Sequence, residues 1–129
     1  MKKAYIIRKG VSINQIKDLL HFIDNYKGGI IKTIYASDET STVEKLMEGS
    51  DIALLFLGKE NSNSKFEREI SLTHSLGLRR AVFTLDENAY PSLTPIGIPF
   101  IWKMHCGYVH RATQSNILRT IRGATKWGV

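Results

Sequence analysis

The sequence predicts an α/β domain in which a five-stranded parallel sheet carries helices on both faces. Short apolar segments alternate five times with segments of helical periodicity, which is the pattern of consecutive βαβ units. The run Asp51–Leu57 (Asp-Ile-Ala-Leu-Leu-Phe-Leu) is apolar almost throughout, as in a central parallel strand that is buried on both faces. Because crossovers between parallel strands are right-handed, few topologies remain, and we expect the strand order 2-1-3-4-5.

Turn and capping residues mark the first two strands and the helix between them. Lys3–Arg8 is a short run rich in β-branched residues that suits a buried first strand. Ser12–Gln15 has the pattern of a capping box and opens a helix that ends at Gly28–Gly29. The second strand is expected over Gly29–Ala36. The apolar residues of the helix recur at helical spacing and are Ile13, Ile16, Leu19, Leu20 and Ile23.

Two further capping boxes predict the helices that flank the third strand. Ser41–Glu44 opens a short helix that closes at Gly49–Ser50. A polar loop, Gly58–Asn63, follows the third strand. Ser64–Glu67 then opens another helix, for which Gly77 is a suitable end.

The last part of the chain adds two strands and a helix. Arg80–Leu85 is the fourth strand, and the loop Asp86–Pro99 holds all three prolines. Phe100–Met104 is expected as the fifth strand. The final helix starts at Thr113 or Ser115, and its inward residues are expected to be Ile117, Leu118, Ile121 and Ala124. The complete pattern is that of a flavodoxin-like, three-layer domain.

Length and composition set the broad class. The 129 residues fit one domain by the usual range of about 100–200, so we expect residues 1–129 to fold as a single unit. The lone Cys106 cannot form an internal disulfide, is expected to be inert, and suggests a cytoplasmic protein. No signal peptide is recognised after Met1, and no run approaches the roughly 18 apolar residues of a membrane span, so no membrane partner is expected.

The formal net charge of +6 favours anionic ligands, but the charges are spread along the chain. The nearest approach to a cluster lies in and before the last helix and comprises Arg111, Arg119, Arg122 and Lys126. Either a solvated helix face or a stripe for nucleic acid would account for it. We expect the solvated face and no nucleic-acid partner.

Topology alone predicts where a ligand would bind. In open α/β sheets the site lies beyond the carboxyl ends of the strands, where the strand order reverses. Here that point falls between the loops Arg8–Val11 and Gly58–Ser64, with Asp38–Ser41 beside them. Capped helix starts and the cations of Arg8 and Lys9 would suit a phosphate-bearing ligand, although both residues could simply end a strand at the surface.

Several known site types are excluded by their missing residues. Arg8-Lys9 and Leu57-Gly58 stand where a receiver domain needs carboxylates. Gly-rich phosphate-loop and dinucleotide fingerprints are absent from the sequence, and no Cys/His group has zinc spacing. We therefore expect no metal.

One part of the chain resembles the TIR (Toll/interleukin-1 receptor) family. Gly49–Leu57 matches the helix end and apolar third strand of that family, and Ser64–Ile70 (Ser-Lys-Phe-Glu-Arg-Glu-Ile) resembles its Ser-x-Trp-x-x-x-Glu-[Ile/Leu] helix start. The turn Leu76–Arg80 and the strand after it extend the resemblance. It is strongest over residues 49–85.

The resemblance implies an enzyme that cleaves NAD, with Glu69 as the catalytic carboxylate. Phe66 would stack on a ring of the ligand, and Arg8 or Lys9 would meet its diphosphate. Asp38 and Ser64 complete the candidate binding residues. No cofactor is implied beyond NAD as substrate. Members of the family often act as homo-oligomers, and bacterial members often serve antiphage defence.

Other interpretations remain open at this point. Glu69 could be a solvated glutamate near a helix start, where the helix dipole favours acids by about 0.3–1 kcal/mol. Phe66 could be a core residue. The domain could be a non-catalytic self-association module of the same family, or a nucleoside enzyme of the deoxyribosyltransferase type, which also needs a carboxylate beside a sugar.

Overall fold

A computed structural model describes residues 2–35, 43–58, 64–85 and 110–123, and the side chains of 64–67, 70 and 123 are outside that description. Its five strands form one sheet in the order β2-β1-β3-β4-β5, and every neighbouring pair is parallel. This confirms the predicted fold class and strand order. The strands are β1 (Lys2–Lys9), β2 (Ile31–Ile34), β3 (Ile52–Leu57), β4 (Arg79–Thr84) and β5 (His110–Arg111).

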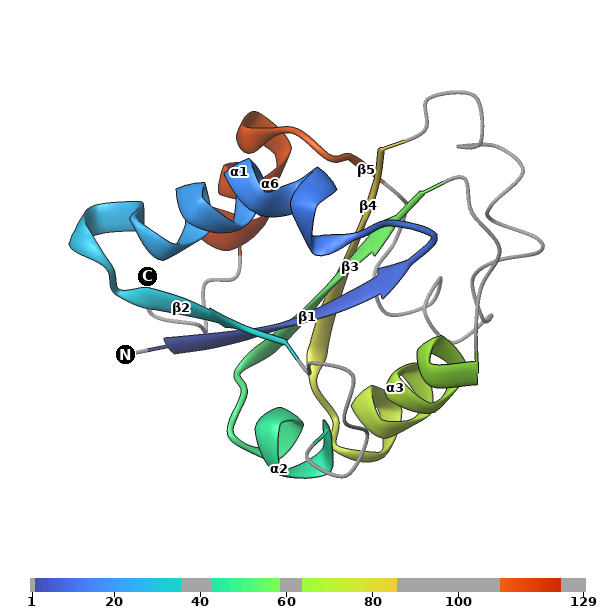
Figure 1. The fold of residues 1–129 in the computed structure, drawn as a ribbon. Coiled ribbons are helices and arrows are strands. Elements are labelled where there is room, and N and C mark those ends of the chain that lie inside the picture. The colour runs from blue at the N-terminus through green and yellow to red at the C-terminus, as the bar shows by residue number, and fades with distance from the viewer. Residues whose placement is uncertain (1, 36–42, 59–63, 86–109, 124–129) are drawn as a thin grey trace.

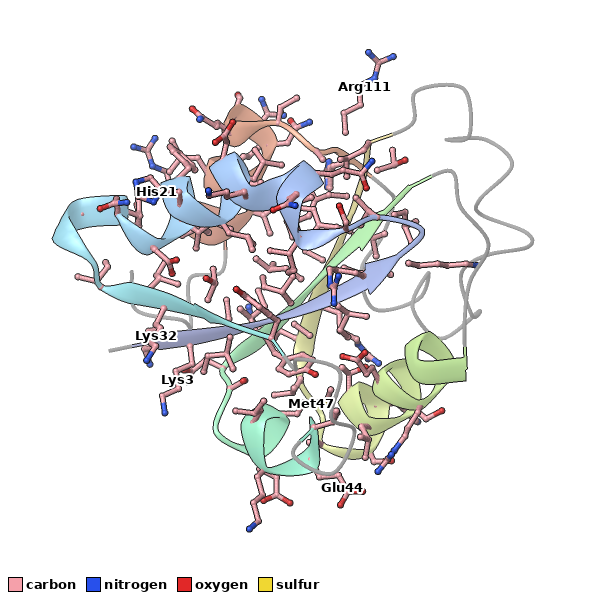
Figure 2. The ribbon with its side chains drawn as sticks, viewed as in Figure 1. Lys3, His21, Lys32, Glu44, Met47 and Arg111 are labelled. Atoms are coloured by element: carbon pink, nitrogen blue, oxygen red, sulfur yellow. The ribbon has the colours of Figure 1, made fainter. Side chains whose placement is uncertain are left out.

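Helices cover both faces of the sheet (Figure 1). One layer holds α1 (Ile13–Asp24), the short 3-10 helix η1 (Tyr26–Gly28) and α6 (Gln114–Gly123). The other holds α2 (Val43–Glu48) and α3 (Ser64–Ser75). Figure 2 shows Met47 of α2 directed toward the sheet and Glu44 directed away from it. None of the described helices is long and apolar enough to cross a membrane.

The two layers enclose two separate apolar cores, because side chains alternate between the faces of a strand. Ala4 and Ile6 of β1 belong to the core under α1 and α6. Tyr5 and Ile7 belong to the core over α2 and α3. All six residues of β3 are buried, as the continuous apolar run predicts.

The helix α1 forms as its capping pattern predicts. The Ser12 hydroxyl accepts from the Gln15 amide, and the Gln15 side chain accepts from the Ser12 amide at 2.7 Å, so the capping box is confirmed. At the other end, the Asp24 carboxylate accepts from the Thr33 amide at 2.7 Å and from the Thr33 hydroxyl at 2.9 Å. These bonds tie the end of α1 to β2.

The sequence analysis did not predict the fifth strand that the structure describes. The strand paired with β4 is His110–Arg111, where Phe83 aligns with His110. Phe100–Met104 lies outside the described residues. His110–Arg111 could not be recognised as a strand from its pattern, because two polar residues carry neither an apolar run nor an alternation.

The loops that follow β1 and β3 touch at the reversal of strand order. The Gly58 amide donates to the Lys9 carbonyl at 2.8 Å. Gly10 has a left-handed backbone with φ 69°. A Cβ atom built on Gly58 would overlap the Gly10 carbonyl oxygen, so only glycine allows this approach.

We therefore expect Gly58→Ala to lower the free energy of unfolding by about 1–3 kcal/mol, because the backbone of the Gly10 loop must move. Urea denaturation followed by circular dichroism measures the change. Gly49→Ala is the matched control, since a Cβ there meets its nearest atoms at 3.9 Å, an ordinary contact. Equal stability of both variants would contradict the close approach.

His110 connects the edge strand to the core, with its ring centroid 6.1 Å from that of Phe83. Burial, and secondly the positive charge of Arg119, hold the pKa of the His110 imidazole below its ordinary value of 6.5. The unfolded chain therefore binds a proton at a pH where the folded chain does not. The free energy of unfolding must then decrease as the pH falls from 6.5 toward the lower, folded-state pKa.

We expect His110→Gln to lose less stability than the wild type between about pH 7.5 and about pH 5, because the substitution removes this titration. Urea midpoints at the two pH values measure the difference. His21→Gln, at an exposed histidine of α1, is the control for the chemical change. If the stability of His110→Gln and of the wild type changes equally with pH, His110 is not the source of the pH dependence.

Candidate functional site

The helix α3 places a carboxylate in the core beneath the sheet. Glu69, Leu72 and Thr73 share one helical face by their spacing. Leu72 packs against the α2–α3 core, Thr73 is fully buried, and Glu69 is only 5% exposed. The interpretation of Glu69 as a solvated glutamate is therefore wrong. Its position beyond the first turn of the helix also removes most of the dipole benefit, which falls off within that turn.

A tyrosine of β1 holds this carboxylate. The Tyr5 hydroxyl donates a hydrogen bond of 2.7 Å to Glu69 Oε2, and Tyr5 has no exposed surface. Tyr5 lies between Ile34 of β2 and Ala53 of β3 in the sheet register. The bond therefore joins α3 to the middle of β1, one of the two strands between which the strand order reverses.

Burial at this position has an energetic cost that the hydrogen bond reduces. A carboxylate out of water is strongly disfavoured unless it is paired or hydrogen-bonded. A bond to a charged group contributes about 1.5–3 kcal/mol, roughly twice that of a neutral pair. The Tyr5–Glu69 bond thus offsets part of the cost and fixes the orientation of the carboxylate.

The sequence did not predict Tyr5 as a partner of Glu69, although a signal was present. Tyr5 is the only aromatic residue in the apolar run of the first strand. A buried tyrosine usually finds a partner for its hydroxyl, so its burial implied a polar group in the opposing layer. Which group it was depended on helix packing across 64 positions of sequence.

The two cations predicted for the diphosphate lie on different faces of β1. Tyr5 and Ile7 face α2 and α3, and by alternation Lys9 does too. Arg8 faces the α1–α6 layer with Ile6. Lys9 lies about 13 Å from Tyr5 along the strand. Of the two predicted cations, it is therefore the one on the face of the carboxylate.

Three other candidates cannot be placed. Asp38 lies outside the described residues. Ser64 and Phe66 belong to the first part of α3, but their side chains are outside the description. Their roles stay predictions. Among the residues that the structure describes, no three His, Cys, Asp or Glu side chains lie close enough to hold a metal ion.

Comparisons of the chain with protein-family models, with curated proteins and with solved structures gave no match. The resemblance to TIR domains stays a prediction carried by the motif residues.

We expect Tyr5→Phe to lower the free energy of unfolding by about 1–3 kcal/mol, because it removes a donor from a buried carboxylate while keeping the ring. Urea denaturation near neutral pH measures the loss. Tyr35→Phe, at a tyrosine that is 42% exposed, is the matched control and should change stability by less than about 0.5 kcal/mol.

The double variant Tyr5→Phe/Glu69→Leu separates this bond from general damage to the core. Replacing both partners by apolar groups should restore part of the stability that Tyr5→Phe loses. Additive losses in the double variant would show that the two side chains do not interact.

Proposed function

We propose that this protein cleaves the nicotinamide–ribose bond of NAD and that Glu69 is its catalytic carboxylate. The observation that carries the proposal is the burial of Glu69, held by the Tyr5 hydroxyl at 2.7 Å, on the helix that follows the central strand. Strongly desolvated acids with a specific partner are more frequent at functional sites than on ordinary surfaces. The motif that resembles TIR domains assigns catalysis to this same residue.

The chemistry requires negative charge beside the ribose. When the C1′–N bond breaks, both electrons leave with nicotinamide, which departs as a neutral molecule. Positive charge develops on the ribose, as in glycoside hydrolysis. A preorganised carboxylate in a site that excludes water stabilises that charge far more than one in bulk solvent. Water, or another nucleophile, then completes the reaction at C1′.

The side chains on the same face of β1 suit the remainder of the ligand. Lys9 would meet the diphosphate, and a carboxylate has about four lone-pair sites, enough to accept from a ribose hydroxyl as well as from Tyr5. By the TIR resemblance, we propose that the enzyme acts as a homo-oligomer in the cytoplasm and serves defence against phage.

Glu69→Gln is expected to reduce NAD turnover by about 10²–10³-fold, because it removes the charge while keeping an acceptor for Tyr5. Nicotinamide release, measured by chromatography over a wide range of protein concentrations, tests this. Glu44→Gln is the matched control, since Glu44 is exposed on α2 and pairs with Arg68 at the surface.

Turnover by Glu69→Gln within about threefold of wild type would exclude Glu69 as the catalytic group. If the wild-type protein releases no nicotinamide at any concentration, NAD cleavage is excluded. The non-catalytic self-association module is then the favoured interpretation. A parallel incubation with deoxynucleosides identifies a deoxyribosyltransferase, because a carboxylate beside a sugar serves both reactions.

A further inference from the structure

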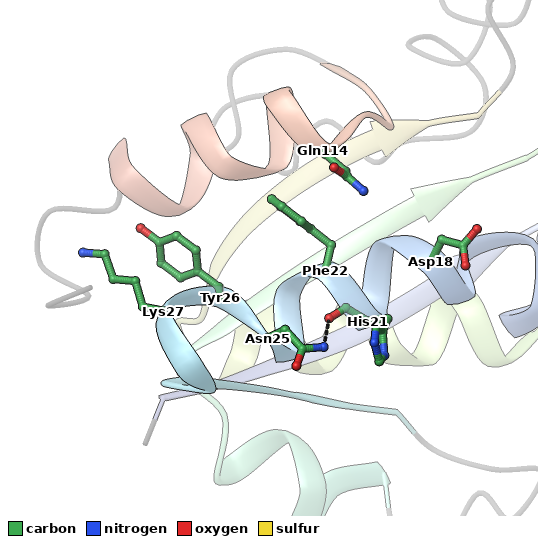
Figure 3. A pocket seen from close by; sticks show the side chains of 7 residues that line it. All are labelled: Asp18, His21, Phe22, Asn25, Tyr26, Lys27 and Gln114. Carbon is green, nitrogen blue, oxygen red and sulfur yellow. Dashed lines mark hydrogen bonds between the residues drawn. The ribbon is translucent and has the colours of Figure 1, made fainter.

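The layer on the other face of the sheet contains a groove between α1 and α6. Its volume is about 650 Å³, within the range of about 300–1,000 Å³ that is usual for small-molecule sites. Figure 3 shows the residues that line it, which come from α1 and its C-cap, from η1 and from the start of α6. They are Asp18, His21, Phe22, Asn25, Tyr26, Lys27 and Gln114.

Two aromatic rings form the apolar wall of this groove. Phe22 and Tyr26 are four residues apart, so they are neighbours along one side of α1 and η1. Both are partly buried against the α1–α6 core, and in Figure 3 both rings point from α1 toward α6. A planar ligand can stack on such rings.

The hydroxyl of Tyr26 has no hydrogen-bond partner in the described part of the chain. Tyr26 Oη is buried and is one of the few such side-chain atoms without a partner among the described residues. Leaving a buried hydroxyl unpaired costs free energy, and native proteins seldom tolerate it without a reason. A ligand acceptor in the groove would satisfy Tyr26 after a change of its χ1 angle that brings the hydroxyl to the groove, because side-chain rotamers commonly change on binding.

The next residue, Lys27, has an unusual backbone. With φ 48° and ψ 42°, it is the only non-glycine residue with positive φ in the described part of the chain. This conformation is disfavoured for lysine and persists where it serves a function or is imposed by its surroundings. It places Lys27 Nζ 5.6 Å from the centroid of the Tyr26 ring. A cation therefore lies over the ring that carries the unpaired hydroxyl.

The charges of the groove are separated along its length. Asp18, the one acid among the described lining residues, precedes Tyr26 by two helical turns, or about 12 Å. Lys27 lies at the opposite end in Figure 3. An anionic group is thus favoured at the Tyr26–Lys27 end and disfavoured at the Asp18 end, which sets the direction of a bound ligand.

We propose that this groove binds an aromatic carboxylate. The ring of the ligand stacks on Phe22, and its carboxylate accepts from Lys27 Nζ and from Tyr26 Oη. Such charge-assisted bonds are stronger than neutral ones and explain why a cation and a free hydroxyl occur together. The inference does not rest on NAD cleavage, because the groove lies on the other face of the sheet from Glu69.

The test is a titration of the full chain with benzoate, followed by two-dimensional amide NMR. We expect binding near the millimolar range, with shifts confined to α1, η1 and the start of α6. Benzamide, which lacks the charge, and cyclohexanecarboxylate, which lacks the aromatic ring, should each bind at least fivefold more weakly. Benzoate that shifts no groove residue, or that binds no better than both analogues, overturns the proposal.

Two variants test the residues. Tyr26→Phe removes only the hydroxyl and should weaken benzoate at least fivefold, while the stability of the free protein stays equal or rises. Lys27→Gly removes the cation and relieves the left-handed strain, so it should weaken benzoate and stabilise the fold. Lys17→Met is the control, since Lys17 is an exposed cation of α1 outside the groove. Unchanged benzoate affinity in Tyr26→Phe and Lys27→Gly would refute the assignment.

Discussion

Complete burial of β3 is the constraint on which the rest of this fold depends. Every residue of the strand is covered, so apolar layers must pack on both faces of the sheet. The neighbouring strand β1 shares that requirement over Ala4–Ile7, which divides into two cores by simple alternation. The paired ends of β1 and β3 then bring Gly58 onto the Gly10 carbonyl, and the contact sets the geometry at the reversal of strand order.

Burial of the central strands also explains why a hydrogen-bond acceptor is needed at the position of Glu69. Tyr5 is held in the middle of β1 with no exposed surface, so its hydroxyl must find an acceptor within the α2–α3 layer. A glutamine, a threonine or a backbone carbonyl would satisfy that demand without burying a charge. Glutamate satisfies it at greater cost in desolvation. Packing therefore explains why an acceptor stands there.

The sequence predicted what depends on local pattern and missed what depends on distant partners. The apolar run of β3, the Ser12–Gln15 capping box and the turn at Gly28–Gly29 are local features, and the structure contains them. The edge strand His110–Arg111 exists because β4 offers it a partner, so no pattern of its own could reveal it. The left-handed backbone at Lys27 was equally invisible, since the two glycines after it already explained the turn.

At the candidate site, the motif singled out Glu69 from the sequence, whereas its burial and its bond to Tyr5 became known only from the structure. Periodicity alone would place an acidic residue near a helix start on the exposed face of the helix. Glu69 is buried instead. Tyr5 could be suspected of needing a partner but not matched to one. Arg8 and Lys9 were treated as a pair because they are adjacent, whereas adjacency on a strand sends them to opposite faces.

The two proposed sites are physically independent. The sheet separates Glu69 from the groove at Tyr26 and Lys27, and the side chains between them belong to two different cores. Effects at sites with no shared partner usually add, so a ligand in the groove has no direct route to the carboxylate. Coupling would require β1 itself to shift, and that strand is fixed by β2 on one side and by β3 on the other. The failure of either proposal therefore leaves the other standing on its own observations.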